Sequence, residues 1–121
     1  MARIVRIVES DIKGPYNILD LPDGKSVTFI ATDYKIGRAV REIVADKETK
    51  RVEGHIMRIF VDLSTPVLGA PYLDVLAGKT IALLDALFKS TSLPVKITIT
   101  ASGVEPEKYY VITYEQLPKK S

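Results

Sequence analysis

The stretch that decides the fold is the last third of the chain, LDVLAGKTIALLDALF (73–88) followed by VKITITA (95–101) and KYYVITYE (108–115). Apolar residues spaced three and four apart predict an amphipathic helix over the first segment. Alternation of apolar and polar residues predicts strands over the other two, and Gly103 marks the turn that joins them. A helix before a final hairpin, in a chain otherwise made of strands, predicts a mainly β Greek-key barrel of about five or six strands.

Upstream of the helix the sequence predicts further strands. We expect an N-terminal edge strand from Arg3 to Glu9, a barrel strand from Ser26 to Thr32, and the longest strand from Val52 to Leu63. The segment 36–45 fits either a helix turn or a strand. We expect a strand there, because a hairpin would supply the pairing that the next strand needs.

The alternating apolar residues define the expected core. The barrel interior should contain Val27, Phe29, Ile59, Val61, Ile97, Ile99 and Ile112, with Leu76, Ile81 and Leu84 of the helix as a cap. A chain of 121 residues is expected to form one domain. Within it, residues 1–21 would be the edge strand and a connector, 22–117 the barrel and 118–121 a tail.

Composition narrows the class of protein. The chain has no cysteine, which excludes disulfides, and its longest apolar runs fall well short of the ~20 residues that a membrane helix needs. Charges interrupt the apolar residues at the N-terminus, unlike a signal peptide, so we expect a cytoplasmic protein with no membrane partner. A single asparagine, a single glutamine and abundant Ile, Val, Lys, Arg and Glu indicate a heat-adapted source.

The titratable residues do not form an active site. His55 is the only histidine, it lacks cysteines that could share a zinc ion, and no nucleophile motif accompanies it. The carboxylates are scattered without the spacing of a metal loop; Asp74, for instance, is explained by a helix start. The fragments Gly24-Lys25-Ser26 and Gly78-Lys79-Thr80 lack the earlier glycine of a phosphate loop. We therefore expect no enzyme activity, metal or cofactor.

Basic and aromatic residues favour binding of a nucleic acid. The segment from Tyr34 to Arg58 contains seven cationic and four anionic side chains. Its net charge of +3 therefore exceeds the net charge of +2 for the whole chain. A local basic surface can attract a polyanion even when the total charge is small, and exposed aromatic rings can stack on unpaired bases. The candidate binding residues are Tyr34, Lys35, Arg38, Arg41, Arg58, Phe60, Lys96 and Tyr110.

Two segments carry a resemblance to a known family. LPDGKSVTFI (21–30), and the helix followed by VKITITASG (95–103) and Tyr110-Val111-Ile112, resemble small OB-fold single-stranded DNA-binding proteins of phages and archaea. The resemblance implies an OB-like fold, binding of single-stranded DNA, Gly103 as the hairpin turn and Tyr110 as an aromatic contact. Ala101 and Glu105 depart from the family, which often has a basic residue and a glycine at these positions.

These observations lead to two expected functions. The first is sequence-tolerant binding of single-stranded DNA or RNA, with Arg38, Arg41 and Arg58 on phosphates and Tyr34, Phe60 and Tyr110 on bases. The alternative is a protein-interaction module or accessory subunit that uses an OB-like barrel without nucleic acid. Its interface, with another protein or a second copy, would include Ile30, Ile56 and the loop from Pro66 to Tyr72.

Overall fold

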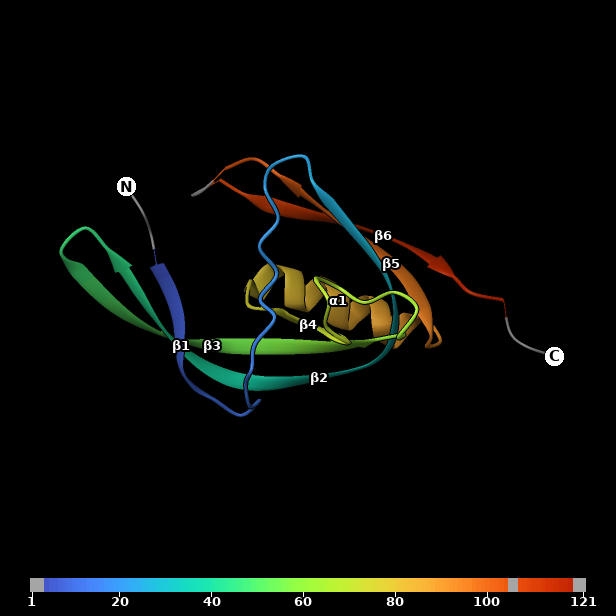
Figure 1. The fold of residues 1–121 in the computed structure, drawn as a ribbon, viewed down its shortest axis with the longest axis horizontal. Helices are drawn as coiled ribbons and strands as arrows, with labels where there is room; N and C mark the ends of the chain where they lie inside the picture. Colours follow the sequence, from blue (N-terminus) through green and yellow to red (C-terminus); the bar gives the residue numbers. More distant parts are fainter. Residues whose placement is uncertain (1–3, 105–106, 119–121) are drawn as a thin grey trace.

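The computed structural model describes residues 4–104 and 107–118, with side chains from Arg6 onward. Its elements are β1 (Ile4–Ser10), β2 (Ser26–Ala45), β3 (Glu48–Val61), β4 (Tyr72–Val75), α1 (Gly78–Ser90), β5 (Val95–Ser102) and β6 (Tyr109–Gln116). The protein is mainly β with one helix before the last hairpin, as the sequence predicts (Figure 1). The expected strand start at Arg3, and Glu105 and Pro106 of the expected turn, lie outside the described residues.

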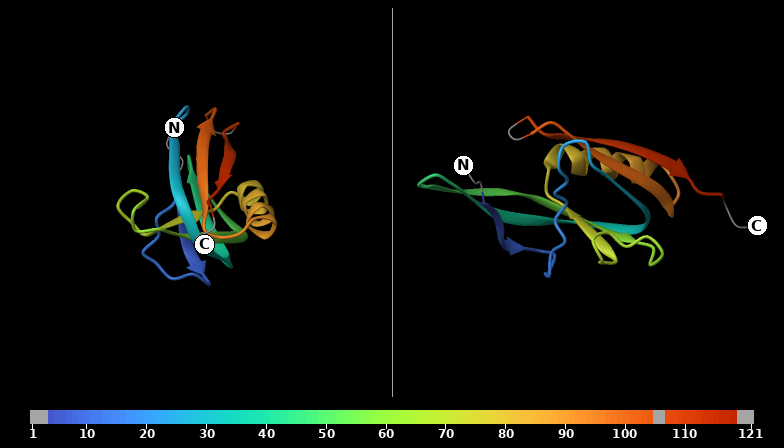
Figure 2. Two further views of the ribbon diagram at one scale, coloured as in Figure 1. Left: turned by 90° about the vertical axis from the view of Figure 1, so that its right-hand side faces the viewer. Right: turned by 45° about the horizontal axis from the view of Figure 1, so that its top comes forward.

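All six strands belong to one antiparallel sheet. The order is β4–β3–β2–β5–β6, and β1 pairs with the far end of β2. The end view in Figure 2 shows β2, β5 and β6 curving around one side, with α1 between β6 and the β3–β4 pair. The sheet is not closed into a barrel among the described residues, because no strand ladder joins β6 to β4. The mainly β fold is thus confirmed, whereas the predicted Greek-key barrel is not confirmed.

A single long strand organises the sheet. Residues 26–45, expected as two strands, form the continuous β2, and the ambiguous segment 36–45 is a strand as predicted. The first part of β2 pairs with β5, and the remainder pairs with β3. The register of the β2–β3 ladder shifts between Ala31 and Asp33, where β2 contains a β-bulge. Such a bulge bends the strand and increases its twist, so β2 can serve both halves of the sheet.

The end of β2 and the start of β3 project as a hairpin arm. Their ladder continues in register to Ala45 opposite Glu48, and Figure 1 shows the arm extending beyond the helix. β1 pairs with this arm, from Ile4 opposite Val44 to Ser10 opposite Ala39. The predicted N-terminal edge strand is thus confirmed, although it pairs with the arm and not with the barrel-like part.

The helix starts later than predicted, at Gly78 and not at Leu73. Residues 72–75 form β4, paired with β3 from Phe60 opposite Tyr72 to Met57 opposite Val75, and α1 begins only at Gly78. Helical spacing of apolar residues continues back through 73–77, but the three successive residues 73–75 are all buried, so both faces of a short strand are covered there. Pairing with β3 therefore overrides the helical pattern.

The main core lies between the concave side of the sheet and α1. Phe29, Ile59, Val61, Ile97 and Ile99 are buried as predicted, and Ile81 and Leu84 cover them from the helix. Val27 and Ile112 are only partly buried, at the margin of this core, and Leu76 belongs to a second cluster instead. The predicted pattern of alternation is therefore right for both β3 and β5.

A second, smaller core lies on the opposite, outer face of the sheet. Residues 11–19 cross this face as an irregular segment, which we call the strap (Figure 1). Ile12 of the strap is buried against Ala39 and Ile56. Gly37 permits this approach, because a Cβ at that position would lie 3.0 Å from the Cβ of Asp11. Ile56, expected as an exposed interface residue, is fully buried beneath the strap.

The loop between β3 and β4 contains a strained tight turn. Val67 and Ala70 exchange two backbone hydrogen bonds of 3.0 Å around Leu68 and Gly69, whose φ angles are 50° and 79°. Two successive positive φ angles define a type I′ turn, for which Asn-Gly is the preferred pair. Leucine pays a steric cost of about 1–2 kcal/mol in this left-handed conformation.

We therefore expect Leu68→Asn to raise the free energy of unfolding by about 1 kcal/mol, because asparagine tolerates positive φ. Leu68 is exposed, so the substitution loses no core contact. Urea unfolding at equilibrium measures the change. The matched control is Leu63→Asn, which replaces another exposed leucine of the same loop outside the turn. Equal effects of the two substitutions would show that the turn is not strained.

Candidate nucleic-acid interface

A buried ion pair joins β3 and β4 on the outer face of the sheet. Nε and Nη2 of Arg58 on β3 donate to the two carboxylate oxygens of Asp74 on β4, at 2.8 and 3.0 Å. Asp74 is fully buried, and the Arg58 side chain is only 11% exposed. The hydrogen bond to Asp74 raises the pKa of Arg58 above its ordinary value. Asp74, predicted to mark a helix start, instead lies in β4 as the partner of Arg58.

The same pair holds the strap in place. Arg58 also donates to the backbone carbonyls of Lys13 and Pro15, at 3.0 and 3.1 Å. Asp74 accepts a third hydrogen bond from the backbone N–H of Asn17, at 2.8 Å. The Asn17 side chain donates to the carbonyls of Val67 and Tyr72. The only asparagine of the chain thus ties the strap to the loop that leads into β4.

Two tyrosines enclose the Arg58 guanidinium. Its central carbon lies 4.2 Å from the ring centroid of Tyr72 and 6.0 Å from that of Tyr16. The Tyr72 hydroxyl donates to the Pro15 carbonyl at 2.6 Å. Such cation–π contacts gain strength when the cation is removed from water. Arg58 was expected to bind phosphate, but all three nitrogens of its guanidinium donate to Asp74 or to carbonyls of the strap.

Phe60 and Lys35 lie beside this cluster. Phe60 pairs across the ladder with Tyr72, and Lys35 pairs with Arg58, so all four side chains share the outer face. The Lys35 ammonium lies 5.8 Å from the centroid of the half-buried Phe60 ring. Lys35 is exposed and forms no ion pair within the described part of the chain. We call Lys35, Phe60, Tyr72 and Tyr16 the Phe60 surface.

The remaining predicted residues lie elsewhere. Tyr34 faces the main core, where its ring centroid is 4.7 Å from that of Phe88 and its hydroxyl donates to Asp85. Burial, together with the Asp85 charge, raises the pKa of Tyr34. Tyr110 also packs against the main core, and Lys108 lies 5.5 Å from its ring centroid. These two rings therefore lie against the main core, on the side of the sheet opposite the Phe60 surface.

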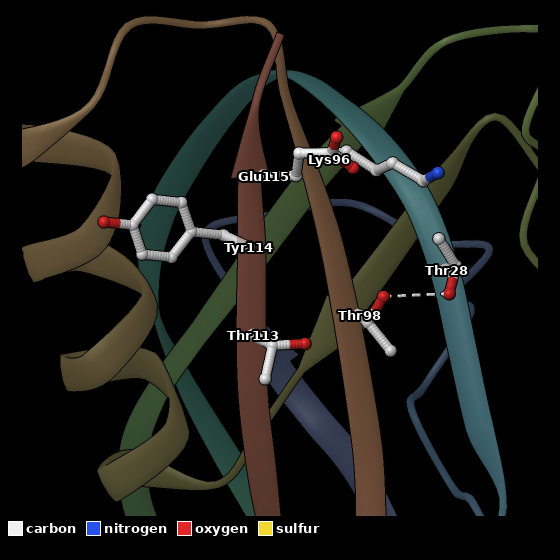
Figure 3. A pocket seen from close by; sticks show the side chains of 6 residues that line it. All are labelled: Thr28, Lys96, Thr98, Thr113, Tyr114 and Glu115. Carbon is white, nitrogen blue, oxygen red and sulfur yellow. Dashed lines mark hydrogen bonds between the residues drawn. The ribbon is translucent and has the colours of Figure 1, made fainter.

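The predicted cations of the arm and of β5 are also separate from the Phe60 surface. Arg38 forms an exposed ion pair with Glu53. Arg41 lies across Gly54, and its Nε is buried without a hydrogen-bond partner among the described residues. Lys96 lies on β5 above a shallow hollow lined by threonines, as Figure 3 shows. The eight predicted residues thus do not form one site, and only Lys35, Arg58 and Phe60 lie together.

Sequence reasoning missed Tyr16 and Tyr72 as members of this surface. Tyr72 was assigned to a loop, and Tyr16 to an extended connector, so neither had a defined neighbour. Once the strand over 72–75 is known, alternation along β3 and β4 places Tyr72 beside Phe60. Tyr16 has no such signal, because its position depends on the strap.

The described residues include no metal-binding cluster. No group of three or more His, Asp or Glu side chains is close enough to hold a metal ion in the part of the chain that the structure describes. His55 is exposed on the arm, opposite Arg38 in the ladder. No helix within the described ranges is long and apolar enough to cross a membrane.

In comparisons with known proteins, no family model, curated protein or solved structure matched this chain. The function must therefore be argued from the geometry of the chain itself.

Breaking the buried ion pair should destabilise the protein strongly. We expect Asp74→Asn or Arg58→Met to lower the free energy of unfolding by about 3–5 kcal/mol, because each leaves the other charge buried and unpaired. The double variant should lose much less than the sum of the two single losses. Chemical denaturation of the four proteins measures this coupling, and additive losses would contradict it. The exposed pair Arg38–Glu53 is the matched control, with an expected coupling below about 1 kcal/mol.

Proposed function

We propose that this protein binds single-stranded nucleic acid, with little sequence preference, on the Phe60 surface. The observation that carries this proposal is the exposed Lys35 ammonium beside the Phe60 ring, with Tyr72 as the next ring on the same face. A base can stack on an aromatic ring whatever its identity, while a nearby ammonium neutralises the phosphate. Base stacking of this kind contributes about 1–3 kcal/mol for each ring.

The order of the strands supports the proposal. If β2 is taken as the first strand of an OB-like unit, β3 and β4 are its second and third strands. In OB-folds, which can be partly open, the face of these two strands binds oligonucleotides and oligosaccharides. Phe60 and Tyr72 lie on these two strands, and on the outer face. Strand order, the OB-like resemblance of the sequence and the placement of the rings thus favour the same surface.

The strap limits this surface at one end. It covers Arg58 and Ile56, so a ligand would reach Phe60 and Lys35 beside the strap and not beneath it. Asp33 lies opposite Phe60 in the ladder, and its carboxylate accepts the backbone N–H of Tyr34. A carboxylate there opposes phosphate binding, so the proposed affinity rests on stacking more than on charge.

The proposal predicts that the affinity for labelled oligo-dT falls when the ring or the ammonium is removed. Phe60→Ala should cost about 1–3 kcal/mol of binding free energy, and Phe60→Leu should cost nearly as much, because leucine keeps the bulk but has no π-face. Lys35→Gln should lower the slope of the logarithm of affinity against the logarithm of salt concentration by about 1. Fluorescence titrations at two salt concentrations measure both effects.

Matched variants separate the Phe60 surface from general charge and exposure. Tyr109→Ala removes an exposed ring of β6, and Lys79→Gln removes one charge from α1; neither should change binding. Asp33→Asn should strengthen it, since a repulsive charge is lost. Absence of binding by the unmodified protein at low salt would refute the proposal, as would an unchanged affinity of Phe60→Ala and Phe60→Leu.

One observation favours the alternative, a protein-interaction module. Leu63 and Leu68 of the loop before β4 are 81% and 78% exposed. Two strongly exposed leucines in one loop, one of them in a strained conformation, suit contact with an apolar surface of another protein. This reading gains weight if oligo-dT does not bind.

A further inference from the structure

The residues of β6 favour strand pairing, and one edge of this strand is unpaired in the described part of the chain. It pairs with β5 on one side, and its other edge has no strand partner among the described residues. Its sequence, YYVITYEQ, contains no proline, glycine, lysine or arginine. Tyr109, Val111 and Tyr114 are 59%, 46% and 56% exposed. An unpaired edge rich in aromatic and β-branched residues is a template for another strand.

The other edges of the sheet are protected. The β4 edge is covered by the strap, where Asp74 donates its backbone N–H to Asn17 and accepts one from Leu19 at 2.8 Å each. β1 carries a bulge between Ile7 and Glu9. The arm part of β3 carries charged side chains, among them Lys50, Arg51 and Glu53. Bulges, charges and coverage are the devices by which proteins block edge pairing, and β6 has only Glu115 near its end.

We propose that β6 pairs with β6 of a second copy of this chain, antiparallel, around a two-fold axis at Ile112. A two-fold axis perpendicular to the sheet keeps the core-facing residues of both copies on one face. With the axis at Ile112, Tyr110 lies opposite Tyr114 of the second copy, and Val111 lies opposite its Thr113. Aromatic pairs and β-branched pairs across neighbouring strands both stabilise a sheet. This pairing is independent of the Phe60 surface, which lies on β2, β3 and β4.

Neighbouring registers fit less well. An axis at Val111 places Glu107 opposite Glu115 of the second copy, and like charges directly opposite are destabilising. An axis at Thr113 places the apolar Val111 opposite the charged Glu115, whereas the Ile112 axis places Tyr109 opposite Glu115, where the tyrosine hydroxyl can donate to the carboxylate. Only the Ile112 axis combines an aromatic pair on one face with a β-branched pair on the other. The chain itself therefore favours one register and a second copy as the partner.

The helix supplies an apolar surface below the added strand. Asp85 contacts Tyr34 of β2, and at about 100° per residue Leu83 and Leu87 lie on the opposite flank of α1. Leu83 is 58% exposed. Figure 2 shows α1 alongside β6, and in Figure 3 the Tyr114 ring points toward the helix. Core-facing side chains of the second copy would extend this contact, which gives the helix flank an apolar partner.

The absence of cysteine allows a direct test by crosslinking. Across the two-fold axis Ile112 would face itself, with Cα atoms about 4.5–5.5 Å apart, within the range that a disulfide bridges. Oxidised Ile112→Cys should run at twice the 13.4 kDa of the chain and return to one chain on reduction. Leu63→Cys, at an exposed loop position, is the control that should remain mostly uncrosslinked.

Because Ile112 is partly buried, a second test uses the exposed positions Val111 and Thr113. A mixture of Val111→Cys and Thr113→Cys chains should crosslink mainly as the mixed dimer, since these two residues lie opposite each other in the proposed register. Sedimentation of the unmodified protein should show twice the chain mass, and Val111→Lys should weaken the dimer while Leu63→Lys should not. A monomer at all concentrations, or no preference for the mixed disulfide, would overturn the proposal.

Discussion

The buried pair of Arg58 and Asp74 is the interaction on which the outer face of this protein depends. Removing two charges from water is costly, and the cost is offset only when geometry and further hydrogen bonds are favourable. Here the guanidinium also reaches two strap carbonyls, and the carboxylate also accepts the Asn17 N–H. One pair thereby fixes β4 to β3 and the strap to both.

The consequences of this constraint reach the candidate site. The strap buries Ile56 and Arg58, which removes one apolar and one basic residue from the surface. It also orients Tyr72, whose hydroxyl binds the Pro15 carbonyl. Lys35 lies just beyond the strap and is exposed, and the Phe60 ring beside it is half-buried. The proposed ligand surface is therefore the part of the outer face that the ion pair and the strap leave uncovered.

Much of the fold could be predicted from the sequence, because alternation and helical spacing are local properties. The core of β3 and β5, the strand at 36–45 and the helix before the last hairpin follow from these patterns. β4 could not be predicted, since its four residues continue the helical spacing and become a strand only through pairing with β3. The predicted barrel is not confirmed for a related reason: whether β6 pairs with β4 depends on packing between segments that are far apart in the chain.

The candidate site was predictable only in part. Phe60 beside a cation followed from alternation, although Lys35, not Arg58, proved to be the accessible cation. The contact of Arg58 with Asp74 could not be predicted, because the two residues are 16 positions apart and their pairing depends on a register that the sequence does not reveal. The position of the strap, which decides what is exposed, is set by tertiary contacts alone.

The most direct test of the central claim is an NMR titration of the labelled protein with a short oligo-dT, followed through its backbone amide signals. We predict that the largest shifts occur at Asp33 to Lys35, at Arg58 to Phe60 and at Tyr72, where the Phe60 surface lies. Signals of β6 should remain largely unchanged. Shifts concentrated on β6 or on the arm, or no shifts at all, would contradict the claim that nucleic acid binds beside the strap.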